Sequence, residues 1–293
     1  MRLQNFDLKR KLTLIVFIFL VSCGKSQIVT DRVTKIDPLI EKNSVTDYQI
    51  CHSSSLCIDN QKLLKNLYGG GVRFLDINTV EVNSSGIANL VYSTKFIYRN
   101  DYYALFISGF SAYDKNGDVP TCHACGQQMG LAIFRFNSEK KLWEDFSLNN
   151  NVGDFGSFGN LNMGAMKNST LGLYEIANNN FLLTFDQGYM GQGYISEWVE
   201  LISISKGDGA LGSQRIGGIS IAEINCSGNE RDDLDWSSTK EFVNNDKIPY
   251  PDVHLTIAHK SLPCDAKNSK IVSLKKQIYR YDVVKNSYLE VNH

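Results

Sequence analysis

The sequence predicts an all-β fold, with antiparallel hairpins in either a propeller-like or a β-sandwich arrangement and one short helix. Segments that alternate apolar and polar residues, rich in β-branched and aromatic side chains, recur along the chain. Turns with Asn, Asp or Gly separate several of them, at 99–101, 178–180 and 206–209. Helical periodicity occurs over 60–68, where three leucines fall on one face. Many strands with one short helix are typical of the all-β class.

Eleven segments carry the strand pattern, and turn residues between them indicate hairpins. In chain order they are 72–82, 87–98, 102–110, 130–137, 171–177, 180–186, 195–205, 215–224, 253–259, 270–282 and 287–291.

Two of these segments begin a longer shared pattern. The sequence FRFN at 134–137 is followed by Trp143, and YRYD at 279–282 is followed by Tyr288, each six positions after the Asn or Asp. The pattern indicates a strand, a polar turn and a returning strand that carries an aromatic ring. It resembles the outer hairpin of kelch-type propeller blades, which implies a propeller. The upstream glycine pair of kelch repeats is missing and no constant period runs through the chain, so a sandwich or two packed β modules stay open.

The first 22 residues have the organisation of a secretory signal peptide. Three basic residues at 9–11 precede a ten-residue apolar run from 12 to 21. A helix of that length covers about 15 Å, half of a bilayer core, which is too short for a permanent span. The next residues, LVSC at 20–23, resemble the bacterial lipobox. This resemblance implies cleavage before Cys23 and attachment of fatty acids such as palmitate to it.

The domain organisation follows from this leader. We predict a signal peptide over 1–22, a lipidated tether over 23–47 and an all-β domain over 48–293. The lipid on Cys23 makes the membrane a partner. Gly24 resembles the residue that follows the cysteine in lipoproteins sent to the outer membrane, which implies an outer-membrane location facing the periplasm or the cell surface.

Composition and charge limit the partners. Hydrophobic residues make up 43% of the chain and charged residues 21%, as in a globular protein. Thirty basic residues against 31 acidic residues give a formal net charge of −1. Nucleic acid is not an expected partner, because binding phosphates requires a basic surface.

The cysteines indicate an oxidised, exported protein. Besides Cys23, the chain has an even number of cysteines, which in an exported protein favours disulfides. Pairing between sequence neighbours is the simplest arrangement, although the spacing cannot select one connectivity. The residues are Cys51, Cys57, Cys122, Cys125, Cys226 and Cys264.

The pair Cys122 and Cys125 has a second interpretation. A C-x-x-C segment resembles a thioredoxin-type redox site, and His123 between the cysteines would favour a thiolate. Such sites normally open a helix, whereas Pro120 and Gly126 flank this segment and no helical period follows. We therefore predict a structural disulfide, with redox activity and metal binding as alternatives.

Two glycine–aromatic loops, 154–160 and 187–194, are the predicted ligand contacts. Glycine lets the backbone turn tightly and can leave a ring uncovered on one side. The rings can instead fold into the core. The predicted contact residues are Phe155, Phe158, Tyr189, Met190 and Tyr194.

No catalytic set, metal site or cofactor is expected. The segment DKNGD at 114–118 begins like a calcium loop, but Cys125 stands at the twelfth position where a Glu is required. Phosphate-loop, dinucleotide and nucleophile-elbow motifs are missing from the sequence. We therefore expect a binding module for an envelope protein or a cell-wall glycan, of which an inhibitor or immunity protein is one form.

The rival hypotheses are an envelope hydrolase and a thiol–disulfide protein that uses Cys122 and Cys125. A cleft with two convergent carboxylates, from any pair among Asp154, Asp186 and Glu197, would favour the hydrolase.

Overall fold

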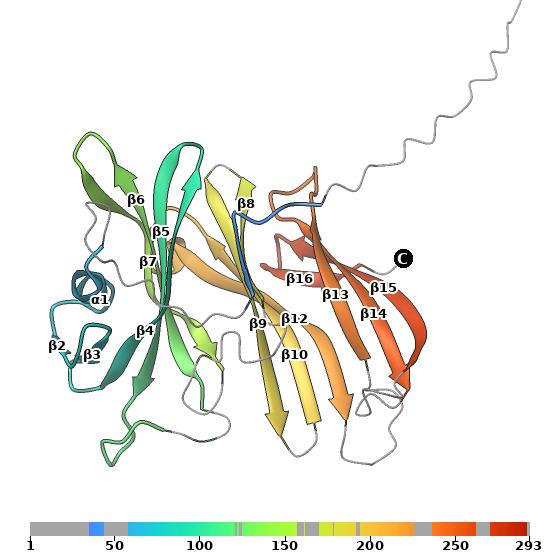
Figure 1. Ribbon diagram of the computed structural model, residues 1–293, viewed down its shortest axis with the longest axis horizontal. Helices are drawn as coiled ribbons and strands as arrows, with labels where there is room; N and C mark the ends of the chain where they lie inside the picture. Colours follow the sequence, from blue (N-terminus) through green and yellow to red (C-terminus); the bar gives the residue numbers. More distant parts are fainter. Residues whose placement is uncertain are drawn as a thin grey trace, which may run out of the picture. The chain divides into compact units, whose positions relative to one another are not determined.

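The computed structural model describes residues 35–43, 58–120, 122, 125–156, 161, 170–177, 179–191, 194–225, 236–261 and 270–291. All of them belong to one compact unit, Val33–His293. Their strands form two sheets, and the described part of the chain contains one α-helix (Figure 1). The predicted all-β class with a single short helix is confirmed.

The sheets differ in size. The first has nine strands in the spatial order β1 (Ile40–Asn43), β8 (Thr170–Ala177), β9 (Asn180–Gly191), β10 (Tyr194–Ile204), β12 (Ser213–Asn225), β13 (Trp236–Val243), β14 (Asp252–Ser261), β15 (Lys270–Asp282) and β16 (Ser287–Glu290). The second has seven, β11 (Gly207–Asp208), β7 (Leu142–Phe155), β6 (Gln127–Asn137), β5 (Asp101–Ala112), β4 (Gly86–Tyr98), β3 (Thr79–Val82) and β2 (Val72–Phe74). The α-helix α1 spans Asn60–Tyr68, and a short 3₁₀ helix spans Gly209–Leu211.

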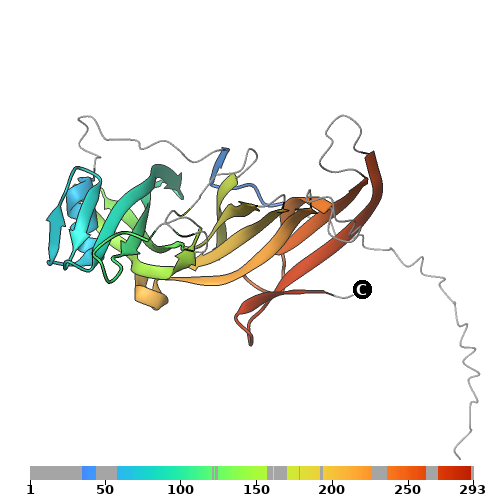
Figure 2. The same cartoon turned by 90° about the horizontal axis from the view of Figure 1, so that it is seen from below.

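The central core lies between the two sheets. It joins apolar side chains from β4–β7 of the second sheet to those from β8–β10 of the first. Figure 2 shows these strands in green and yellow. Phe181 packs edge-on against Phe96, Tyr98 and Tyr103 at centroid distances of 5.8, 5.3 and 5.8 Å. Two large sheets that share a core form a β-sandwich, whereas a propeller repeats small blades around an axis. The sandwich alternative is therefore the one observed in the described residues.

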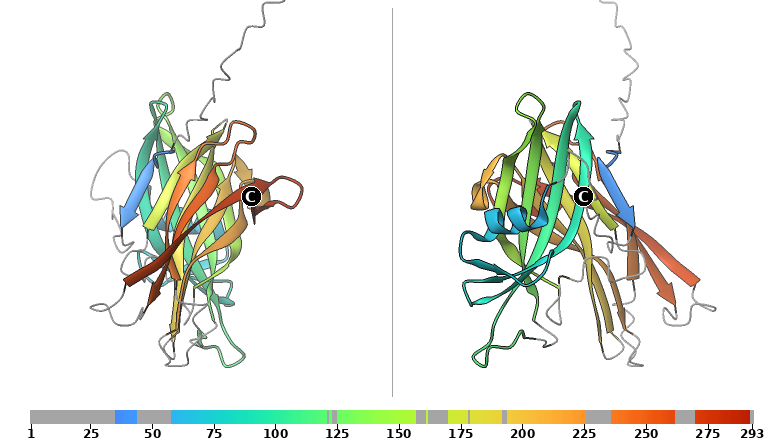
Figure 3. Two further views of the ribbon diagram at one scale, coloured as in Figure 1. Left: turned by 90° about the vertical axis from the view of Figure 1, so that its right-hand side faces the viewer. Right: turned by 60° about the vertical axis from the view of Figure 1, so that its left-hand side comes forward.

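The helix α1 covers the outer face of the second sheet (Figure 3). Its N-cap, Asp59, accepts a hydrogen bond from the Gln61 amide at 3.0 Å, and Gly69, at φ +85°, ends it. Leu63, Leu64 and Leu67 are buried against the sheet. The helix predicted over 60–68 is confirmed at both ends.

The first sheet curls to enclose a third core. β12 and β13 pair at two positions only, Ala222 with Ser237 and Glu223 with Trp236. Beyond them, β16 contacts β12. Apolar side chains of β8–β10 and β12–β16 fill the space inside the curl.

Residues 35–43, here called the N-terminal strap, connect strands that are not neighbours. The Ile36 amide donates to the Phe242 carbonyl of β13 at 2.9 Å, and β1 then pairs with β8. The predicted tether over 23–47 is therefore wrong for the strap, which is part of the folded body. Backbone hydrogen bonds hold it there, and Ile36, Leu39 and Ile40 pack against the cores.

The segment predicted as one strand over 72–82 is a hairpin of two short strands, β2 and β3. Four described strands were not predicted. β1 and β11 are short, whereas β7 and β13 are 14 and 8 residues long.

Both predicted aromatic hairpins form, and their turns have the same geometry. In the β6–β7 hairpin, Asn137 Oδ1 accepts from two backbone amides of the turn, and in the β15–β16 hairpin Asp282 Oδ1 does the same. The fourth turn residue has positive φ in each, Lys141 at 54° and Asn286 at 51°. The hairpins lie in different sheets, so they are two copies of a turn motif within a sandwich.

Candidate functional site

A groove between α1 and the β6–β7 hairpin, here called the α1 groove, has a volume of about 590 Å³. Lys62 and Asn66 line it from the helix. Phe134, Trp143 and Asp145 line it from the sheet. It therefore combines an aromatic wall with polar side chains of both charges, which is the usual composition of a small-ligand site.

The sequence places these side chains by simple periodicity. Asp59, Lys62 and Asn66 follow one another at three and four residues, so they lie on one flank of α1 while the leucines face the sheet. On the sheet, Phe134 pairs with Asp145 and Phe136 pairs with Trp143 across the two strands. Paired residues share a face, and alternate residues do too, so these four side chains project toward the helix.

Two polar groups of the groove have unusual surroundings. The Trp143 Nε1 atom is buried and has no hydrogen-bond partner among the described residues. Its ring packs edge-on against Phe136 at 5.3 Å. Burial raises the pKa of Asp145, as does the charge of Asp208, and Lys62 opposes the shift. A buried donor without a partner is uncommon in proteins and is often completed by water or a ligand.

The other two acids of the groove are already hydrogen-bonded within the protein. Asp59 accepts the amide hydrogen of Gln61 as the cap of α1. Glu144 accepts hydrogen bonds from Lys140 at 2.8 Å and from Asn137 at 2.9 Å. The bond from Lys140 is the main reason that the pKa of Glu144 lies below its ordinary value. Asp145 is thus the acid of the groove that is oriented least by its neighbours.

The groove suits a polyhydroxylated ligand. Aromatic rings pack against the C–H face of a sugar, a carboxylate accepts from hydroxyl groups, and ammonium and amide groups donate to them. Lys62, Asn66, Trp143 and Asp145 supply one group of each kind.

No family model, curated protein or solved structure matches the chain.

The two predicted glycine–aromatic loops are brought together. Gly156 donates its amide hydrogen to Gln187 Oε1 at 2.7 Å, and Gln187 Nε2 donates to the Leu161 carbonyl. Gln187 is 1% exposed, so a buried amide side chain links the end of β7 to β9.

Phe155 is not an exposed contact ring, and the prediction for this residue is wrong. It is 3% exposed and belongs to the central core. Its ring packs against Phe185 at 5.5 Å, and the Arg215 guanidinium lies 5.3 Å from its centroid. Phe158 lies outside the described residues. The neighbouring glycines allowed the strand to bring the ring inward as readily as outward.

Tyr189 and Tyr194 lie in strands near the tip of the β9–β10 hairpin. Both are half-buried, and Tyr194 pairs with Gly191. The Tyr189 hydroxyl lies over Gly191, where an added Cβ would come within 2.4 Å of it. The side chain of Met190 is not among those described. The Tyr189 ring therefore covers the end of its strand, and the use of Tyr189 and Tyr194 as ligand contacts stays a prediction.

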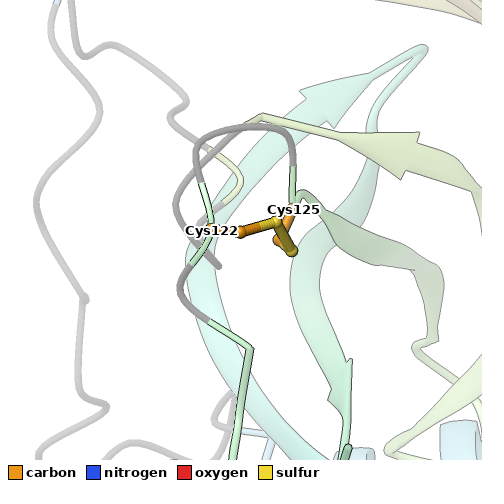
Figure 4. Close-up of a disulfide and its surroundings, with 2 residues drawn as sticks. All are labelled: Cys122 and Cys125. Carbon is orange, nitrogen blue, oxygen red and sulfur yellow. A yellow bond between two sulfur atoms is a disulfide. The ribbon is translucent and has the colours of Figure 1, made fainter.

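One of the predicted disulfides is present. Cys122 and Cys125 are bonded, with Cα atoms 5.1 Å apart, in the connection between β5 and β6 (Figure 4). Cys23, Cys51, Cys57, Cys226 and Cys264 lie outside the described residues. A second hollow of about 360 Å³ adjoins Cys125 and is lined by Pro120 and Asp154 among others.

Two of the three carboxylates that would favour a hydrolase share a face of the first sheet. Asp186 on β9 and Glu197 on β10 are diagonal neighbours, since Glu197 pairs with Gly188. Asp154 lies apart from them, at the second hollow. Asp186 is engaged by Lys240 and Thr170, so its oxygens are already hydrogen-bonded within the protein.

The segment 114–118, which begins like a calcium loop, forms hydrogen bonds within itself. Asp114 Oδ1 accepts from the amides of Asn116 and Asp118 at 2.8 and 3.0 Å, and these backbone bonds lower its pKa. Among the described residues, no cluster of three His, Cys, Asp or Glu side chains is placed to hold a metal ion. Within the same residues, no helix has the length and apolar character to cross a membrane.

Sequence reasoning missed the α1 groove. The sequence pattern indicated only that Trp143 lies in a hairpin. The spacing of Asp59, Lys62 and Asn66 would have indicated that these polar residues share one flank of the helix. Their juxtaposition with Trp143 depends on how α1 docks on the sheet, which no local pattern encodes.

Proposed function

We propose that the chain is a lipid-anchored binding module of the bacterial envelope and that its α1 groove binds a cell-wall glycan. The observation that carries the proposal is the combination of Trp143 and Phe134 on one wall with Lys62, Asn66 and Asp145 around them. A protein ligand usually buries a broader, flatter area than a groove of this volume offers.

The anchor rests on the leader sequence. The basic residues, the apolar run and Cys23 at the expected position support lipidation, and lipidation would hold the domain at the membrane surface. A binding module at that place meets the glycans of the envelope.

The experiment measures binding of soluble peptidoglycan fragments by titration calorimetry. Trp143→Ala removes an aromatic wall, and anchor rings of this kind contribute about 2 kcal/mol or more, so we expect roughly 30-fold weaker binding. Tyr102→Ala is the matched control, because Tyr102 is an exposed aromatic residue, 45% accessible, outside the groove.

Asp145→Asn gives a second measurement that preserves the shape of the groove. Loss of the carboxylate weakens the hydrogen bonds that sugar hydroxyls donate to it, so affinity falls while the fold is unchanged. The proposal is refuted if the fragments bind equally well to wild type and Trp143→Ala, or if they do not bind and a purified envelope protein binds instead.

A further inference from the structure

A buried lysine–carboxylate contact joins two distant strands of the first sheet. Lys240 Nζ on β13 lies 2.6 Å from Asp186 Oδ1 and 2.7 Å from Asp186 Oδ2 on β9. The two side chains are 17% and 9% exposed. The two distances hold the amine and the carboxyl group in contact, and a rotation of the carboxyl group about its Cβ–Cγ bond would bring the carboxyl carbon into line with the amine.

The curl of the first sheet creates this contact. β10 and β12 separate β9 from β13 in the sheet order. Asp186 shares a face with its partner Val199, and Lys240 shares a face with Phe242, and both apolar residues belong to the third core. The amine and the carboxyl group therefore meet at the rim of an apolar interior that limits water.

Thr170 holds one carboxyl oxygen from the other side. Its backbone amide and its hydroxyl both donate to Asp186 Oδ2, at 3.1 and 3.0 Å. Lys240 Nζ in turn donates to the Thr170 hydroxyl oxygen at 3.0 Å. Two donors on one oxygen are the arrangement that stabilises negative charge on a tetrahedral intermediate.

The carboxyl group of Glu197 lies nearby and can carry a proton. It lies diagonally from Asp186 on the same face of the sheet, at roughly 6–8 Å between Cβ atoms. Burial raises its pKa, and the negative charge of Asp186 adds to this, while Lys240 opposes it. A carboxylate whose pKa is raised binds a proton more readily than a free one, so Glu197 can accept a proton and return it.

We propose that Lys240 and Asp186 condense to form an intramolecular isopeptide bond. Glu197 first passes a proton from the Lys240 ammonium to Asp186 Oδ1, which leaves a neutral amine facing a protonated carboxyl group. The amine attacks Cγ of Asp186, and Thr170 stabilises the negative charge that develops on Oδ2. Glu197 then carries a second proton from the nitrogen to Oδ1, which leaves as water. One C–N bond forms, one C–O bond breaks, and Glu197 is regenerated.

The experiment is peptide mapping of the full chain, purified from membranes in detergent, by proteolysis and mass spectrometry. We expect one cross-linked species whose mass is that of the Asp186 and Lys240 peptides minus one water. Quantitative recovery of the two peptides unlinked would overturn the proposal and leave an ion pair.

Two variants test the chemistry without removing the contact. Lys240→Arg keeps the positive charge but lacks a nucleophilic amine, so the linked species must vanish while the chain stays folded by circular dichroism. Glu197→Gln keeps the shape but cannot take up the proton, so linkage must fall at least tenfold at equal age of the sample. Glu241→Gln is the matched control, because Glu241 neighbours Lys240 on β13 and is exposed. Linkage that persists in Lys240→Arg, or that is unchanged in Glu197→Gln, contradicts the mechanism.

Discussion

Truncation of Phe155 separates a core role from a surface role in one measurement. The ring is 3% exposed and packs against Phe185 and under Arg215. Replacing a buried phenylalanine with alanine costs about 3–5 kcal/mol, because the transfer energy of the ring is lost and a cavity remains.

The surroundings place Phe155→Ala near the upper end of that range. Gly153 lies beside the ring, since a Cβ added to it would be 3.4 Å from Phe155 Cε2, and this glycine has no side chain with which to fill the space that the ring leaves. The lost aromatic pair with Phe185 adds about 0.5–1.5 kcal/mol. We therefore expect a loss of about 4–5 kcal/mol, which corresponds to a fall in melting temperature of roughly 10 °C for a domain of this size.

The assay is thermal denaturation followed by far-ultraviolet circular dichroism, with urea denaturation as a second probe. Tyr102→Ala is the control, since an exposed aromatic residue is expected to change stability by less than about 0.5 kcal/mol. A melting temperature of Phe155→Ala within about 2 °C of wild type would refute the placement of this ring in the core.

The two matched hairpins and the leader give further predictions. Arg280→Ala leaves the carboxylate of Asp252, 8% exposed, without its bidentate partner, so we expect a loss of about 3 kcal/mol in urea denaturation. Arg135→Ala removes the corresponding ion pair with Asp101, which is 39% exposed, and should cost less than about 1 kcal/mol; equal losses would contradict this reasoning. Cys23→Ala should abolish incorporation of labelled fatty acid, and persistent labelling would exclude lipidation at this residue.

Helix α1 and most strands were predictable because their patterns are local. Three leucines on one face, an Asp cap and a terminal glycine define α1 without reference to the rest of the chain. The same is true of the strands that have one face in a core, since alternation records which side is buried.

β7 and β13 were missed because their stabilising partners lie far away in sequence. β7 shifts register twice against β6, which breaks the alternation of apolar and polar residues along it. Its buried Asn149 side chain donates a hydrogen bond to the Ser213 carbonyl of β12 at 2.7 Å. β13 points Lys240 inward, where Asp186 and Thr170 accept hydrogen bonds from its ammonium group. A polar residue facing a core makes a strand resemble a loop in the sequence.

For the candidate site, the sequence allowed prediction of the types of residue involved but not of their positions in the fold. Glycine–aromatic loops indicated where rings could be exposed, but glycine does not determine the direction of the ring, and Phe155 turned inward. The α1 groove forms between a helix and a hairpin that β2 to β5 separate in the sequence. Its aromatic and charged residues could each be named from the sequence, whereas their meeting could not.

The N-terminal strap has a consequence for the order in which the chain folds. The strap is synthesised before either of its partners, yet the Leu39 amide bonds to the Leu173 carbonyl and the Ile36 amide bonds to the Phe242 carbonyl. Contacts between residues so distant in the chain form late, because the entropy of closing a long loop is lost before they are gained. The strap must therefore wait until β13 has been synthesised, and synthesis of the chain up to that strand sets the earliest moment at which the strap can take its final place.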